Sequence, residues 1–206
     1  MSVDVLVVGI GGQGVMTAAE AIARAALAAG YEATKTEVTG MSQRGGVVCS
    51  QVRIGERVEA SEIRPGSAQL LIAFEAAEGL RWSHYLAPQG RALLDPWRAV
   101  PPVVSSGIHA YPENPADTLR SAGRQVREIE ARGTAERLGD ARLANSVMLG
   151  AAAESLPFST AVLRSEVLRR FGGNPMLAEA NARAFDAGQA ATDGKPASAI
   201  ASSASS

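Results

Sequence analysis

Short apolar runs alternate with helix-forming stretches along most of the chain, beginning at the N-terminus. An apolar run with β-branched residues begins at Val5, the pattern of a buried parallel strand. Four glycines within six positions interrupt it, namely Gly9, Gly11, Gly12 and Gly14. Helix-forming residues follow over 18–29, and Gly30 provides a C-terminal cap. The order of strand, glycine turn and helix directs backbone N–H groups and the positive end of a helix towards an anion.

The same alternation continues and predicts the fold class. We expect strands over residues 31–38, 47–54, 69–74, 91–94, 103–106 and 126–131. We expect helices over residues 76–86, 116–122, 140–156, 160–171 and 176–190, with a further helix starting near residue 134. Gly55 and Glu56 form a turn into a short partner strand, residues 57–63, which predicts an inserted hairpin. Strands that alternate with helices indicate a Rossmann-like α/β fold, with a mostly parallel sheet flanked by helices and a helical C-terminus.

The end of the chain departs from this periodicity. From Thr192 onwards the residues are mainly alanine and serine, with almost no large apolar side chain. Such a segment cannot bury enough apolar surface to fold. We therefore expect residues 192–206 to be a disordered tail and residues 1–191 to form one domain, which the length of 206 residues allows.

Charge and composition exclude several classes of partner. The formal net charge is −1, which leaves no electrostatic footprint for nucleic acid or an anionic membrane. No apolar run approaches the roughly 18 residues that a membrane span needs, and the N-terminus lacks a basic segment followed by a cleavable apolar one. The single cysteine, Cys49, cannot form an intrachain disulfide or hold a zinc ion or an iron–sulfur cluster alone. We expect a cytoplasmic protein with no metal site of its own.

Two glycine-rich loops, each following a strand, form the candidate binding site. The first offers backbone N–H groups, and the second, residues 39–46, adds hydroxyl, amide and guanidinium groups. The Arg44 guanidinium suits a phosphate or a carboxylate. Because the carboxyl ends of neighbouring parallel strands share one rim of a sheet, we expect both loops to face the same cleft. The candidate ligand-binding residues are Gly11, Gly12, Gln13, Gly14, Thr39, Ser42, Gln43, Arg44, Gly45 and Gly46.

The first loop also fits a second class of ligand. Gly9, Gly11 and Gly14 satisfy the dinucleotide-binding fingerprint, and Glu37 lies about 20 residues on, where the acid that binds the ribose is expected. A free-standing protein that binds NAD or FAD is therefore an alternative. The antiparallel hairpin after the second strand argues against it, because the adenosine ribose would lie at that strand end. A further alternative is that packing alone shapes both glycine loops.

A few other polar residues are candidates for chemistry. Glu75 and Asp95 follow strands and lie at the expected rim, within reach of a ligand. Asn145 and Ser146 interrupt an apolar helix, which is typical of a hydrogen-bonded core or an interface. There is no phosphate-binding loop of the type Gly-x-x-x-x-Gly-Lys-Ser/Thr.

Nucleophilic catalysis has little support in the sequence. His84 lies beside two aromatic residues, which favours packing, and His109 follows a Ser-Ser-Gly segment. No Gly-x-Ser-x-Gly elbow is present, however, and no acid is placed by a motif to orient the histidine. Cys49 falls inside a predicted strand, where it is expected to be a core residue.

The two loops become specific in combination with the strand after them. Residues 9–14 (GIGGQG), 37–46 (EVTGMSQRGG) and 50–55 (SQVRIG) together resemble the gamma domain of 2-oxoacid:ferredoxin oxidoreductases. The resemblance continues through residues 71–75 and 145–151 and covers about residues 3–190. Within that family the chain is most similar to the beta subunits of indolepyruvate ferredoxin oxidoreductases.

This resemblance implies a division of labour. A large alpha subunit would hold thiamine diphosphate, magnesium and the iron–sulfur clusters, decarboxylate an aryl-2-oxoacid, pass electrons to ferredoxin and form an acyl-CoA. The present chain would be the subunit without clusters, inactive alone, whose loops help to close the active site or bind coenzyme A. No catalytic residue is carried over by the resemblance. A purely structural subunit, whose loops only pack on the partner, is the alternative within this family.

Overall fold

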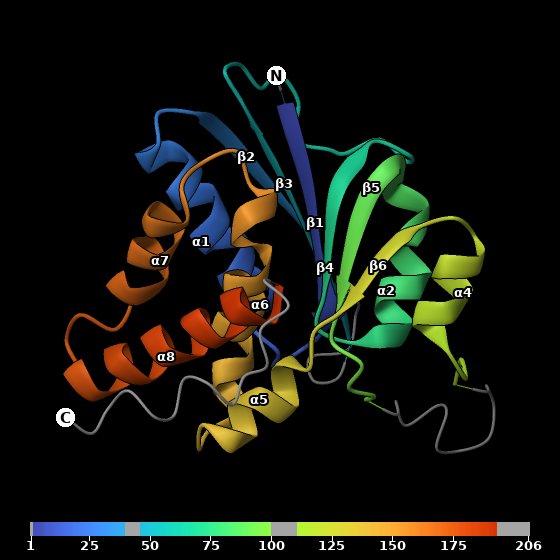
Figure 1. The fold of residues 1–206 in the computed structure, drawn as a ribbon. Coiled ribbons are helices and arrows are strands. Elements are labelled where there is room, and N and C mark those ends of the chain that lie inside the picture. Colours follow the sequence, from blue (N-terminus) through green and yellow to red (C-terminus); the bar gives the residue numbers. More distant parts are fainter. Residues whose placement is uncertain (1, 40–45, 100–110, 193–206) are drawn as a thin grey trace.

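The computed structural model describes residues 2–39, 46–99 and 111–192, and Figure 1 shows their arrangement. A six-stranded sheet in the order β2-β3-β1-β4-β5-β6 forms the centre. Its strands are β1 Ser2–Ile10, β2 Glu32–Thr39, β3 Val47–Gly55, β4 Ala68–Ala73, β5 Leu86–Leu94 and β6 Gln125–Glu128. β1, β4, β5 and β6 are parallel to one another, whereas β3 is antiparallel to both β1 and β2. The predicted mostly parallel sheet is confirmed.

Helices cover both faces of the sheet (Figure 1). α1, α5, α6, α7 and α8 lie on one face, and α2 and α4 lie on the other. Their bounds are α1 Val15–Ala28, α2 Ala76–Trp82, α4 Pro115–Ser121, α5 Ala131–Arg137, α6 Ala144–Ala152, α7 Thr160–Arg169 and α8 Pro175–Thr192. Three short 3₁₀ helices are η1 Ser83–Tyr85, η2 Ala141–Leu143 and η3 Ala153–Ser155. The predicted α/β class and helical C-terminus are confirmed.

Strand β1 lies in the middle of the molecule and is buried on both faces. Val5 and Val7 pack into the larger cluster beneath α1, and Leu6 and Val8 pack into the smaller cluster beneath α2. All four side chains are fully buried. A strand covered by helices on both faces carries apolar residues at every position, which explains the uninterrupted apolar run in the sequence.

Helices α6 and α8 cross with no room for a side chain between them. A Cβ atom at Gly150 would lie 1.9 Å from the Phe185 carbonyl oxygen, and one at Gly188 would lie 1.9 Å from the Val147 carbonyl oxygen. Ser146 Oγ also donates a hydrogen bond of 2.7 Å to Asn181 Oδ1 across this crossing. The close contact holds α6 in place, and the first turn of α6 contacts the glycine turn after β1.

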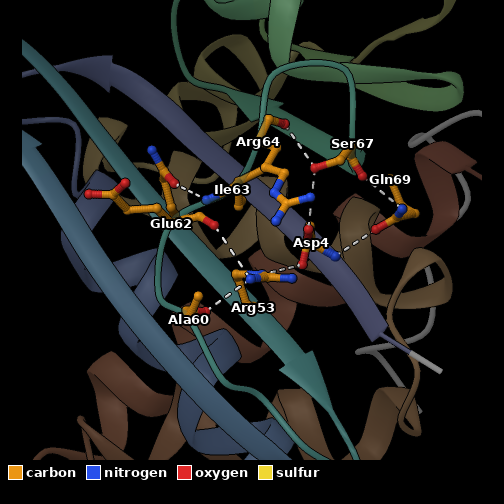
Figure 2. Close-up of polar contacts among 9 residues, drawn as sticks. Asp4, Arg53, Ala60, Glu62, Ile63, Arg64, Ser67 and Gln69 are labelled. Carbon is orange, nitrogen blue, oxygen red and sulfur yellow. Dashed lines mark hydrogen bonds and ion pairs between the residues drawn. The ribbon is translucent and has the colours of Figure 1, made fainter.

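The predicted hairpin partner over residues 57–63 is wrong. This segment forms no strand, and the antiparallel neighbours of β3 are β2 and β1. Side chains hold the segment instead, because Gln51 Oε1 accepts a bond of 2.6 Å from the Ile63 N–H and the Arg53 guanidinium donates to the carbonyls of Ala60 and Glu62 (Figure 2). These bonds satisfy the backbone without a strand ladder.

Several predicted boundaries are also wrong. The helix expected over residues 76–86 ends at Trp82 and continues as η1, so that β5 begins at Leu86 instead of residue 91. β6 ends at Glu128 instead of residue 131, because α5 begins at Ala131. The helix expected over residues 140–156 is divided into η2, α6 and η3. The expected strand 103–106, His109 and the tail from residue 193 lie outside the described residues.

Candidate functional site

The turn between β1 and α1 adopts a conformation that requires glycine. Gly12 and Gly14 have positive φ angles of 99° and 80°, in a region that residues with a Cβ atom rarely adopt. Gly14 is the N-cap of α1, and no side chain caps this helix. Among the described residues, none accepts a hydrogen bond from the N–H of Val15 or Met16. The positive end of α1 is therefore available to an anion.

Gln13 shapes this turn with its side chain. Its Oε1 accepts a bond of 2.7 Å from the Ile10 N–H, and its Nε2 donates a bond of 2.7 Å to the Phe74 carbonyl oxygen at the end of β4. A Cβ atom at Gly9 would lie only 2.5 Å from Gln13 Oε1. Packing therefore explains Gly9, and the Gln13 amide is engaged by the protein itself.

The last residue of the second loop contacts the first loop. Gly46 accepts a hydrogen bond of 2.8 Å from the Gly11 N–H. The strands before the two loops are not neighbours as expected, because β3 lies between β1 and β2 and pairs Val47 with Ile10 and Val48 with Thr39. That both loops face the same cleft stays a prediction. Four of the candidate residues, Ser42, Gln43, Arg44 and Gly45, lie outside the described residues.

A cavity of about 960 Å³ opens beside the first loop on the α1 face of the sheet. It lies between the glycine turn, the loop after β5, the start of α6 and the α7–α8 connection. Among the described residues, none from the second loop lines it. The lining residues that bear on a ligand are Gly12, Gln13, Gly14, Thr17, Asp95, Trp97, Arg132, Asn145, Arg170 and Asn181.

Arg170 is the arginine of this cavity whose charge is not neutralised within the described part of the chain. Its Nη1 donates a bond of 2.9 Å to Thr17 Oγ1, on the first turn of α1. It follows α7 as the C-cap residue, so that α7 brings a cation to the positive end of α1. The other lining arginines pair with carboxylates: Arg24 with Glu20, Arg132 with Glu136, Arg142 with Asp140, and Arg169 with Glu166.

Asp95 organises the opposite wall of the cavity. The carboxylate is buried, with 3% of the residue exposed, and accepts bonds from the N–H groups of Trp97 (3.1 Å) and Arg132 (2.8 Å). Burial raises the pKa of Asp95 from 3.8 to about 6, and the two backbone bonds oppose that rise only in part. The Arg132 guanidinium lies 5.2 Å from the centre of the Trp97 ring. Asp95 therefore positions a flat, half-buried aromatic surface beside the glycine turn.

Asn145 joins α6 to the glycine turn. Its Nδ2 donates a bond of 2.8 Å to the Gly14 carbonyl oxygen and lies 3.4 Å from the Gln13 carbonyl oxygen. A Cβ atom at Gly14 would lie 2.8 Å from the same nitrogen. The neighbouring Ser146 is buried and bonded to Asn181, as a hydrogen-bonded core residue would be.

The remaining candidates lie away from this cavity. Glu75 is buried on the α2 face, where it accepts bonds from the Glu78 N–H and the Tyr111 hydroxyl and caps α2. Glu37 pairs with Lys35 at 2.8 Å on β2, which β3 separates from β1. Neither carboxylate contacts the glycine turn.

The sulfur and imidazole candidates also have structural explanations. Cys49 is fully buried, and burial raises the pKa of its thiol to about 12, as in a core residue without reactivity. His84 is exposed, and its Nδ1 lies 3.0 Å from the Arg81 carbonyl oxygen, near the rings of Trp82 and Tyr85.

Four residues of this cavity were not expected from the sequence, namely Thr17, Trp97, Arg132 and Arg170. No local motif marks them, because each becomes a site residue only through the packing of α5, α7 and the loop after β5 against the glycine turn. Within residues 2–39, 46–99 and 111–192, no group of three or more His, Cys, Asp and Glu side chains could hold a metal ion. No helix in those ranges is long and apolar enough to cross a membrane.

Curated proteins of similar sequence share one description. Indolepyruvate oxidoreductase subunit IorB of Thermococcus kodakarensis is 34% identical over 189 residues, which cover 90% of this chain and 93% of that protein. Its namesake from Archaeoglobus fulgidus is 39% identical over 152 residues, covering 73% of this chain and 75% of that protein. Both alignments cover most of each sequence.

Solved structures show the same fold. A 2-oxoglutarate:ferredoxin oxidoreductase from Magnetococcus marinus, with 2-oxoglutarate, coenzyme A and succinyl-CoA bound, matches with a TM-score of 0.73 and 25% identity over 93% of this chain and 31% of that chain. The gamma subunit of a keto/oxoacid ferredoxin oxidoreductase from Geobacter sulfurreducens matches with a TM-score of 0.67 and 24% identity, over 92% of this chain and 98% of that one.

One family model matches residues 4–191 of the chain, in agreement with these relatives. The chain belongs to the pyruvate ferredoxin/flavodoxin oxidoreductase family.

Proposed function

We propose that this chain is the subunit that holds no iron–sulfur cluster in a cytoplasmic 2-oxoacid:ferredoxin oxidoreductase, an enzyme that acts on indolepyruvate or another arylpyruvate. The observation that carries the proposal is the likeness to IorB proteins along 90% of the chain. The partner is a large alpha subunit with thiamine diphosphate, magnesium and iron–sulfur clusters. It catalyses the oxidative decarboxylation and the transfer of electrons to ferredoxin, and this chain alone is inactive.

The contribution of this chain is to help close the active site and to hold coenzyme A, the anionic acceptor of the acyl group. The glycine turn, Gly11, Gly12, Gln13 and Gly14, forms the cradle at the positive end of α1. Its donors for a ligand are the N–H groups of Gly12 and Gly14, because those of Gly11 and Gln13 bind carbonyls of the protein. The second loop, Thr39, Ser42, Gln43, Arg44, Gly45 and Gly46, supplies further contacts to the phosphates. The bound coenzyme A in the Magnetococcus marinus enzyme, a relative at 25% identity, supports this assignment.

The cavity beside the glycine turn suits the same ligand. Its Arg170 guanidinium lies at the first turn of α1, where a phosphate would gain a charge-assisted hydrogen bond. Its Trp97 ring offers a surface on which an adenine base can stack. A cavity of about 960 Å³ accommodates a ligand of this size.

Two observations favour this proposal over a free-standing NAD- or FAD-binding protein. In the dinucleotide fold the ribose-binding acid follows the strand beside β1, whereas here β3 occupies that place and β2 lies one strand further out. The Glu37 carboxylate is moreover paired with Lys35, which also pairs with Glu20 on α1. Glu37 is therefore engaged in an ion-pair cluster within the protein.

The first experiment is a pull-down of the tagged full-length chain from its native lysate, followed by mass spectrometry and an activity assay. Recovery of a large chain with thiamine diphosphate and iron–sulfur clusters, with coenzyme A-dependent oxidation of arylpyruvates, is the expected result. Recovery of the chain alone with NAD or FAD bound would overturn the proposal.

The role in coenzyme A binding is tested in the purified complex by Arg170→Ala and Arg44→Ala. Loss of a charge-assisted hydrogen bond is expected to raise the KM for coenzyme A about fivefold. The matched control is Arg64→Ala, an exposed arginine that lines a separate hollow at the amino end of the sheet and is expected to leave this KM unchanged. An unchanged KM for coenzyme A in both site variants would contradict the binding role and favour the alternative of a purely structural subunit.

A further inference from the structure

The glycine turn has few hydrogen bonds of its own. Apart from the strand ladder at Ile10, the backbone bonds of residues 10–14 are Gln13 N–H to the Ile10 carbonyl at 3.2 Å, Gly11 N–H to the Gly46 carbonyl at 2.8 Å and, at the start of α1, Ala18 N–H to the Gly14 carbonyl at 2.9 Å. Gly12 and Gly14 in the same segment have more backbone freedom than other residues, so that fixing the turn costs more conformational entropy. The conformation of the turn therefore depends on side chains that contact it.

Two amide side chains meet this need at the two ends of the turn. Gln13 binds the Ile10 N–H and the Phe74 carbonyl, and so ties the start of the turn to β4. Asn145 binds the Gly14 carbonyl at 2.8 Å and lies 3.4 Å from the Gln13 carbonyl, at the end of the turn. Asn145 is 131 positions away from Gly14 in the sequence, so this contact exists only in the folded protein.

The direction of these carbonyls sets the direction of the donors. In a planar trans peptide the C=O and N–H groups point in opposite directions. A carbonyl of Gln13 held towards α6 by Asn145 therefore turns the Gly14 N–H away from α6. The Gly14 carbonyl is held by the Ala18 N–H and by Asn145 together, and it sets the direction of the Val15 N–H in the same way. These are the first N–H groups at the positive end of α1.

The support of Asn145 is rigid. The next residue, Ser146, is 2% exposed and bonds to Asn181, which is 6% exposed. Further along α6, Gly150 lies against the backbone of α8. We propose that Asn145 is a positioning residue, which holds the glycine turn so that its N–H groups keep the direction that an anionic ligand needs. The identity of that ligand, coenzyme A, rests on the proposed function.

The test uses Asn145→Ala, the isosteric Asn145→Asp, and Ser83→Ala as a matched control. Ser83 Oγ also donates a 2.8 Å bond to a backbone carbonyl, that of Leu80, but on the opposite face of the sheet. The first measurement is amide hydrogen exchange over residues 10–18 in the full-length chain. The amides of Ile10, Gly11, Gln13 and Ala18 are hydrogen-bonded there.

Both Asn145 variants are expected to speed exchange in this segment about tenfold, since a local bond of this kind is worth on the order of one factor of ten. Ser83→Ala is expected to leave it unchanged. In the complex, both Asn145 variants are expected to raise the KM for coenzyme A about fivefold and to keep kcat within about twofold of the native value. This pattern is expected when binding is weakened equally in the ground state and the transition state. A variant that merely unfolds would lower kcat through loss of active complex instead.

Unchanged exchange over residues 10–18 in both Asn145 variants would overturn the positioning role and leave the proposed function untouched. Faster exchange with an unchanged KM for coenzyme A would support the positioning role and overturn the assignment of coenzyme A to this turn.

Discussion

At the amino end of the sheet, polar side chains hold the segment of residues 56–67 and use their hydrogen-bonding groups on one another and on its backbone. At the carboxyl end, the glycine turn is held while the N–H groups of Gly12 and Gly14 bind no described residue. Figure 2 shows the first network, in which Arg53 joins the Asp4 carboxylate to the carbonyls of Ala60 and Glu62. At the other end, Gln13 and Asn145 bind carbonyls and one N–H of the turn, while no described residue accepts from the first N–H groups of α1.

The comparison shows how a structural network differs from a prepared site. Asp4 is 5% exposed and its carboxylate is bonded to Arg53, so that neither charge is left for a ligand. A saturated network of this kind stabilises the fold and nothing else. The glycine turn leaves the N–H groups of Gly12 and Gly14, an arginine without a carboxylate partner and a cavity for a ligand.

The largest effect is expected from breaking the saturated network. Asp4→Ala leaves the Arg53 guanidinium, about a quarter exposed, without its partner, and should lower the free energy of unfolding by about 3 kcal/mol. Urea denaturation of the full-length chain measures this loss. The control Glu59→Ala removes an exposed pair with Arg57 and should change stability by less than about 0.5 kcal/mol.

The same Asp4→Ala variant should leave the KM of the complex for coenzyme A unchanged, because the network lies at the other end of β1 from the glycine turn. If Asp4→Ala lowered the free energy of unfolding by less than about 1 kcal/mol, or changed the KM for coenzyme A, the amino end would not be the purely structural network described above.

A second prediction concerns pH at the carboxyl rim. Burial raises the pKa of Asp95 from 3.8 to about 6, so the native protein binds a proton at a pH where the unfolded chain has lost it. This group therefore contributes stability that is fully present below about pH 4 and is lost as the pH rises through about 6, by roughly 2 to 3 kcal/mol in total.

The pH dependence is measured as the free energy of unfolding of the native chain minus that of Asp95→Asn, between pH 4 and 6.5. We expect the difference to fall as the pH rises, since asparagine does not titrate. A flat difference for Asp95→Asn would show that the carboxylate is ionised throughout, with its two backbone donors outweighing burial.

The smallest effect on stability, and the sharpest contrast in binding, is expected from two matched glycines. Gly14→Ala and Gly30→Ala both place a side chain at a positive φ, of 80° and 87°, which costs about 1 kcal/mol. A Cβ atom at Gly30 would meet nothing within 4 Å, whereas one at Gly14 would press on Asn145 Nδ2. Only Gly14→Ala should raise the KM for coenzyme A, and equal KM values for the two variants would argue against the turn as a binding element.

The fold was predictable where the signal is local. The apolar run, the glycine turn and the first helix were expected from neighbouring residues, and β1 and α1 lie where the pattern placed them to within a few residues. The hairpin over residues 57–63 was wrong, because a turn at Gly55 does not reveal that the side chains of Gln51 and Arg53 will bind the next segment. The positions of Ser42, Gln43, Arg44 and Gly45 stay predictions.

Local sequence patterns were enough to predict the class of the protein, the strand–turn–helix unit and the need for glycine in that unit. The folded protein was needed to see that β3 enters between β1 and β2, that Arg170 contacts Thr17 from 153 positions away, and that Asn145 binds the glycine turn. The physical reason is the range of the interactions. Backbone conformation and apolar periodicity depend on adjacent residues, whereas a cavity and its polar contacts depend on how helices far apart in the chain pack over the sheet.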